Sequence, residues 1–108
     1  MKRTNLNDIE PRILEGPDGD QRIALESKRL AFSVESPPLS PVRLAFVLDE
    51  LQRLIGDRRA GRQHAAQAFP AEFGDGFSPR LCARTLLDTF ERRQGELIAE
   101  RSARSRAR

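Results

Sequence analysis

The spacing of apolar side chains changes once along the chain, from the alternation typical of strands to the period typical of helices. Two short β-favouring pieces within RILEGPDGDQRIALE flank a cluster over residues 16–20 whose residue types suit a turn. In the following RLAFSVE segment, Leu30, Phe32 and Val34 fall on one face. The pattern predicts three short antiparallel strands over about residues 12–35, with one apolar face that needs another element to cover it.

The second half of the chain begins with the clearest helix signal. Ser40 is a good N-cap, and Pro41 follows at the first helical position, where its missing N–H is harmless. We predict a helix over about 41–55 that ends at Gly56. Its apolar positions recur at helical spacing: Leu44, Val47, Leu48, Leu51, Leu54 and Ile55.

Two further helices are predicted after Gly56. One runs over about 57–69, with Asp57 as its N-cap and an end before Pro70. The other runs over about 79–100, because Ser78-Pro79 repeats the earlier start signal. Its apolar stripe contains Ala83, Leu86, Leu87, Phe90, Leu97 and Ile98.

These elements predict an α+β fold, with a small N-terminal antiparallel meander followed by a three-helix C-terminal half. Residues 11–100 are expected to form a single domain, preceded by a flexible arm over 1–10 and followed by a basic disordered tail over 101–108. The short connection at Gly56-Asp57 is compatible with a helix-turn-helix-like corner.

The charge of the chain is concentrated at its end. The sequence holds 19 Lys+Arg against 16 Asp+Glu, for a formal net charge of +3. Four of the arginines lie in the last eight residues, RSARSRAR, which contain no acid. The first hundred residues are therefore close to neutral, so net charge does not predict nucleic-acid binding by the folded part.

Two local surfaces nevertheless favour nucleic acid. The helix expected over 57–69 carries residue types that read guanine and adenine in a major groove, and the tail carries cations that contact phosphates. The candidate nucleic-acid-binding residues are Arg58, Arg59, Arg62, Gln63 and Gln67 in the helix, and Arg101, Arg104, Arg106 and Arg108 in the tail. A solvated helix in an arginine-rich protein and a solubilising tail are the alternative interpretations.

A protein partner is the competing hypothesis. Phe69, Phe73 and Phe77 are spaced through a glycine-containing loop and form a candidate partner-binding anchor. The alternative is that they close the edge of the core. The apolar faces of the sheet and helices can be covered within one chain or shared between two, so a homodimer is also compatible with the pattern.

The sequence predicts no catalytic residue, metal site, cofactor or small-molecule substrate. His64 and Cys82 are single and fall on different predicted helices, and Asp18 and Asp20 lack the rest of a calcium loop. With one cysteine, no long apolar run and no secretory signal, a cytoplasmic protein without a membrane segment is expected.

The expected function is therefore that of a small non-catalytic regulatory protein. One form of this hypothesis is a DNA-associated transcriptional regulator that uses the helix-turn-helix-like element and the Arg-rich tail. The alternative is an adaptor or inhibitor that binds a partner protein through apolar helix faces, or a small subunit of a larger assembly.

Overall fold

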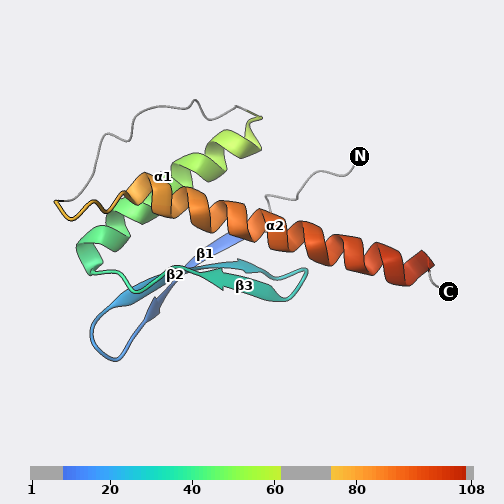
Figure 1. The fold of residues 1–108 in the computed structure, drawn as a ribbon, viewed down its shortest axis with the longest axis horizontal. Helices are drawn as coiled ribbons and strands as arrows, with labels where there is room; N and C mark the ends of the chain where they lie inside the picture. Colours follow the sequence, from blue (N-terminus) through green and yellow to red (C-terminus); the bar gives the residue numbers. More distant parts are fainter. Residues whose placement is uncertain (1–8, 62–73, 107–108) are drawn as a thin grey trace.

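The chain forms a three-stranded sheet followed by two helices that pack on one face of the sheet (Figure 1). The computed structural model describes residues 9–61 and 74–106. The strands are β1 (Ile9–Glu15), β2 (Gln21–Ser27) and β3 (Phe32–Glu35), and the helices are α1 (Pro41–Arg59) and α2 (Pro79–Arg106). The predicted α+β class with an N-terminal antiparallel sheet is confirmed.

β2 is the central strand and pairs antiparallel with both neighbours. The predicted turn joins β1 to β2, with Gly19 at a φ of 81°. β1 begins at Ile9, because Ile9 pairs with Ser27 and buries its side chain in the core. The flexible arm predicted through residue 10 is therefore wrong for Ile9 and Glu10, which are part of the sheet.

The outer face of the sheet is polar. Ion pairs join neighbouring strands there, between Arg12 and Glu26 at 3.2 Å and between Arg22 and Glu35 at 3.4 Å. Such cross-strand pairs suit a solvated face, whereas the alternate positions of the strands face the helices.

α1 begins as predicted but ends later. Ser40 caps it by accepting a hydrogen bond from the backbone N–H of Arg43 at 3.4 Å. The predicted stop at Gly56 is wrong, because the helix continues to Arg59 and the residue with positive φ is Gly61, at 74°. A glycine inside a helix costs only about 1 kcal/mol, and Arg58 ties this last turn to α2 through an ion pair with Asp88 at 2.9 Å.

The helix predicted over 57–69, between the other two, is not shown by the structure. Residues 57–59 form the end of α1 rather than the start of a new helix, so Asp57 is no N-cap and there is no corner at Gly56-Asp57. The rest of that segment, from residue 62, lies outside the described residues. The described part of the chain thus contains two helices.

α2 begins at the predicted residue and runs further than predicted. It passes through Gly95 and continues to Arg106, so the expected change from helix to disordered tail at residue 101 does not occur. With 28 residues it is about 42 Å long, and its C-terminal end projects past the sheet (Figure 1).

The core lies between the sheet and the two helices. Phe90 of α2 is fully buried and packs against Phe32 of β3, with 4.9 Å between the ring centroids and an angle of 32° between the ring planes. The apolar positions predicted for the first helix are buried, except Leu48, which is half-buried. In the predicted stripe of the last helix, Leu97 and Ile98 are half-buried, and the four residues before them are buried: Ala83, Leu86, Leu87 and Phe90.

Candidate functional site

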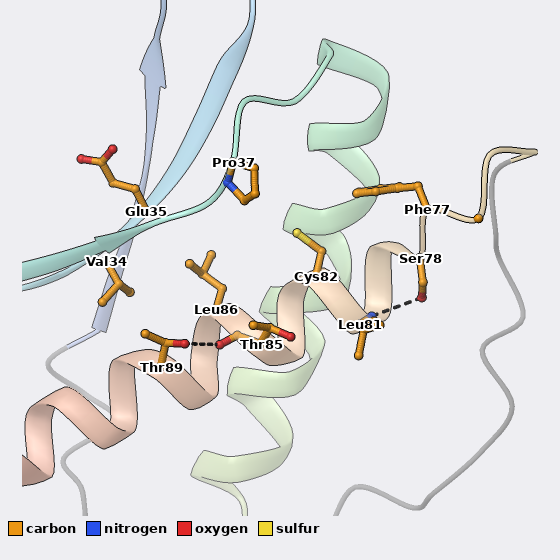
Figure 2. Close-up of a pocket in the computed structure, with 11 residues that line it drawn as sticks. Val34, Glu35, Pro37, Phe77, Ser78, Leu81, Cys82, Thr85, Leu86 and Thr89 are labelled. Carbon is orange, nitrogen blue, oxygen red and sulfur yellow. Dashed lines mark hydrogen bonds between the residues drawn. The ribbon is translucent and has the colours of Figure 1, made fainter.

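An apolar groove separates β3 from the first half of α2 (Figure 2). Its volume is about 420 Å³, within the range of about 300–1,000 Å³ that is common for binding sites. Val34 of β3 and Leu86 of α2 point into it from opposite sides (Figure 2). The lining residues come from β3, the segment after it, the loop before α2 and α2 itself: Val34, Glu35, Pro37, Gly76, Phe77, Ser78, Leu81, Cys82, Thr85, Leu86 and Thr89.

One wall of the groove is a helix with a well-defined start. The Ser78 hydroxyl accepts a hydrogen bond from the backbone N–H of Leu81 at 3.2 Å, which satisfies a donor of the first turn (Figure 2). From this start, Leu81, Thr85 and Thr89 follow at intervals of four residues and so lie on one stripe of α2. Leu81 is 51% exposed, a large value for a leucine beside the core.

The polar character of this stripe is reduced by a local hydrogen bond. The Thr89 hydroxyl donates to the backbone carbonyl of Thr85 at 2.8 Å, so it is already satisfied within the helix (Figure 2). The stripe therefore offers the Leu81 side chain and the threonine methyl groups as apolar surface, beside the exposed hydroxyl of Thr85.

The other wall of the groove is an edge strand. β3 pairs with β2 on one side, and no other strand of residues 9–61 and 74–106 pairs with its outer side. The backbone N–H of Ser36 donates to the carbonyl of Ile23 at 2.8 Å, and the alternation of an antiparallel ladder then directs the N–H and C=O groups of Ser33 and Glu35 away from β2. The groove thus combines apolar side chains with an open strand edge.

The mouth of the groove near α1 is held by an ion pair. Arg43 of α1 contacts Asp75 at 2.5 Å, and its guanidinium lies over the Phe77 ring, 4.8 Å from the centroid. Hydrogen bonds from Arg43 and from the backbone N–H of Phe77 lower the pKa of Asp75. Because Asp75 stays ionised, these contacts hold Phe77 against residues 37–43, where it lines both the groove and an adjoining hollow.

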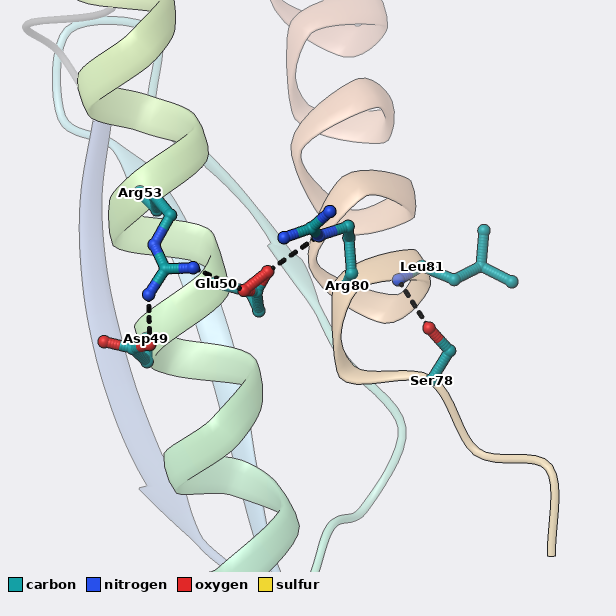
Figure 3. Close-up of polar contacts among 6 residues, drawn as sticks. All are labelled: Asp49, Glu50, Arg53, Ser78, Arg80 and Leu81. Atoms are coloured by element: carbon teal, nitrogen blue, oxygen red, sulfur yellow. Dashed lines mark hydrogen bonds and ion pairs between the residues drawn. The ribbon is translucent and has the colours of Figure 1, made fainter. Parts of the chain in front are cut away.

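The relative position of α1 and α2 is set by a largely buried ion pair. Arg80 donates through Nε to Glu50 at 2.9 Å, and the two side chains are only 13% and 15% exposed (Figure 3). Arg53 contacts the same carboxylate at 3.4 Å and Asp49 at 3.1 Å (Figure 3). This network fixes the first turn of α2, and with it the helical wall of the groove.

Glu35 and Cys82 are the ionisable side chains among the residues that line the groove. Cys82 is half-buried in the wall, and burial raises the pKa of its thiol, so the thiolate nucleophile is disfavoured. His64 lies outside the described residues. Within residues 9–61 and 74–106, no cluster of His, Cys, Asp or Glu side chains is arranged to hold a metal ion, and neither helix has the length and hydropathy needed to cross a membrane.

The residues predicted to read bases are not brought to the groove. Arg58 is three-quarters buried against α2 and contacts Glu91 as well as Asp88, so its charge is used within the fold. Arg59 is exposed at the end of α1. The other three residues of that predicted surface, Arg62, Gln63 and Gln67, lie outside the described residues.

The predicted phosphate-binding tail is partly described. Arg101 and Arg104 are exposed on the last turns of α2. Arg106 belongs to the same helix by its backbone, and Arg108 lies outside the described residues. Phosphate binding by this end of the chain stays a prediction.

Of the three phenylalanines predicted to bind a partner, one lies at the groove. Phe77 is half-buried in its wall, whereas Phe69 and Phe73 lie outside the described residues. Sequence reasoning did not single out Leu81 and Thr85. A signal for Leu81 was present, because this leucine lies off the apolar stripe of its helix.

Comparisons with known proteins add no function to this geometry: no family model, curated protein or solved structure matches the chain.

Proposed function

We propose that this chain is a small non-catalytic adaptor or inhibitor, and that it binds an extended segment of another protein chain in the groove between β3 and α2. The observation that carries the proposal is the coincidence of an open strand edge with an apolar groove beside it. In strand addition, main-chain hydrogen bonds supply affinity, and pockets for alternate side chains supply specificity.

The dimensions of the two layers support this proposal. Two packed helices need about 20 Å of sheet width, because each helix is about 10 Å across, whereas three strands at about 4.8 Å spacing supply less than 15 Å. An added strand beside β3 continues the sheet over α2. Every second side chain of that strand then lies above Leu81 and Thr85, which are exposed in the free chain.

The charges of the groove favour a protein segment over a nucleic acid. Its lining is mostly apolar, and the one ionisable acid in it, Glu35, repels phosphates. Arg43, the cation nearest its mouth, is already paired with Asp75. The residues that line the groove thus include no lysine or arginine to contact the phosphates of a nucleic acid.

A peptide selection tests the proposal. A library of random twelve-residue peptides is panned against the full chain at low surface density, and the enriched peptides are measured against two variants. Ser33→Pro removes an N–H that points away from β2, and proline is tolerated on an edge strand in that orientation. Ser33→Ala is the matched control, because it retains the N–H.

We expect the enriched peptides to alternate apolar and polar residues and to bind the unchanged chain and Ser33→Ala equally. Their affinity for Ser33→Pro should fall by about tenfold, the equivalent of one lost hydrogen bond. Peptides that bind Ser33→Pro as tightly as Ser33→Ala, or a selection that enriches nothing although the chain is monomeric under its conditions, would show that the groove does not bind an added strand.

A further inference from the structure

The free edge of β3 is short and has a defined length. Its outward-facing backbone groups belong to Ser33 and Glu35, and the next outward position is Pro37, which has no N–H to donate. A partner strand therefore forms only a few main-chain hydrogen bonds here, centred on Val34. The occupant must match this short register.

We infer that the segment occupying the groove is β3 of a second copy of this chain, paired antiparallel about a two-fold axis at Val34. This inference rests on the proposed function and names the partner of the same groove. The two copies form one continuous six-stranded sheet with all four helices on one face. Such an isologous contact closes on itself and covers the outer edge of β3 in both copies, while β1 forms each end of the continuous sheet.

The register that the two-fold axis imposes is self-complementary. Ser33 of each copy lies opposite Glu35 of the other, so that each Ser33 and Glu35 N–H meets a carbonyl across the axis. No like charges are directly opposed, and each Glu35 stays beside Arg22 of its own sheet at 3.4 Å. Val34 lies opposite Val34 on the groove side, an apolar cross-strand pair.

The helices also fit this arrangement. α2 contacts both β2 and β3, which places it over that strand pair. With strands about 4.8 Å apart, the axis lies about 2.4 Å outside β3, and α2 lies about 5 Å from the axis. The two copies of α2 are then about 10 Å apart, close to the usual distance of about 8–10 Å between packed helices.

The two copies of α2 face each other through a stripe of uncharged side chains, which can pack together without burying a charge. Leu81, Thr85 and Thr89 carry no charge, and the Thr89 hydroxyl is satisfied within its own helix. Pairing covers Leu81, the most exposed leucine of the described residues. The second copy thus supplies both the missing strand and the missing cover for the helix.

Sedimentation equilibrium of the full chain over a wide concentration range tests this inference. We expect a mass that rises from 12.2 kDa toward twice that value as concentration increases. Ser33→Pro removes an outward N–H from each copy and should weaken association at least about tenfold, with Ser33→Ala as the matched control. Thr85→Arg places a charge on the facing stripe without touching the sheet, and it should also weaken association.

The outcomes separate this inference from the proposed function. A chain that stays monomeric at every concentration, or that dimerises equally well with Ser33→Pro and Thr85→Arg, overturns the inference. If such a monomer still binds selected peptides in a manner that Ser33→Pro abolishes, the groove has a different partner and the proposed function stands. If neither peptides nor a second copy bind at this edge, both fail. Circular dichroism of each variant verifies that it is folded.

Discussion

Phe90→Ala is expected to lower the free energy of unfolding by about 3–5 kcal/mol, the largest effect of any single substitution proposed for this chain. Phe90 is completely buried and is the largest of the fully buried side chains in the described residues. It packs from α2 against Phe32 of β3, so its removal opens a cavity where the second helix meets the edge strand. The same change should loosen the groove, because both of its walls lose a shared contact.

The measurement is chemical denaturation of the full chain, with Phe46→Ala as the matched control. Phe46 is 50% exposed on α1, so the same chemical change there should cost at most about 1 kcal/mol. Equal losses for the two variants would mean that Phe90 does not occupy the centre of the core.

Removing the cation of the buried pair between the helices is expected to have the second largest effect. Arg80→Met should cost about 2–3 kcal/mol, because it leaves the Glu50 carboxylate, only 15% exposed, with Arg53 as its remaining contact at 3.4 Å. The loss should be smaller than for a fully buried pair, since Arg53 partly compensates.

A double-substitution cycle measures this pair directly. Glu50→Leu combined with Arg80→Met should recover most of the lost stability, because no unpaired charge remains buried. Arg53→Ala is the control on the exposed side of the network, where the side chain is 57% exposed and the expected cost is below about 1 kcal/mol. Additive losses in the cycle would contradict a direct contact between Glu50 and Arg80.

The starts of both helices could be predicted to the residue because their signals are local. Ser40-Pro41 and Ser78-Pro79 each place a capping hydroxyl before a proline, and the capping bonds are formed within three residues. Nothing distant in the sequence is needed to form them.

The ends of the helices could not be predicted in the same way, because tertiary contacts decide them. Gly56 has the composition of a stop signal, but Arg58 pairs with acids of α2 and holds the extra turn in place. Gly95 lies in a helix that continues for eleven further residues, to Arg106. At both glycines the helix continues, although a glycine in a helix interior costs about 1 kcal/mol of folding free energy.

The groove was beyond sequence reasoning because it depends on strand order. Alternation places Val34 on the buried face, but it does not show that β3 is an edge strand or that α2 lies beside it. The spacing of Phe77 in a glycine-containing loop left two interpretations, a partner-binding anchor or a side chain that closes the edge of the core. The structure shows Phe77 partly buried against the core, in the groove wall, and partner binding stays a prediction. Leu81 needed the packing of α2 to be recognised as an exposed side chain.

Amide hydrogen exchange at single residues can show whether the outer edge of β3 pairs with another chain. In dilute protein, the amides of Ser33 and Glu35 should exchange fast, while that of Val34 is protected by its bond to β2. Raising the protein concentration, or adding a selected peptide, should slow exchange at Ser33 and Glu35 and leave Val34 unchanged. Exchange rates at Ser33 and Glu35 that respond to neither change would mean that the outer edge of β3 pairs with neither a second copy nor a peptide.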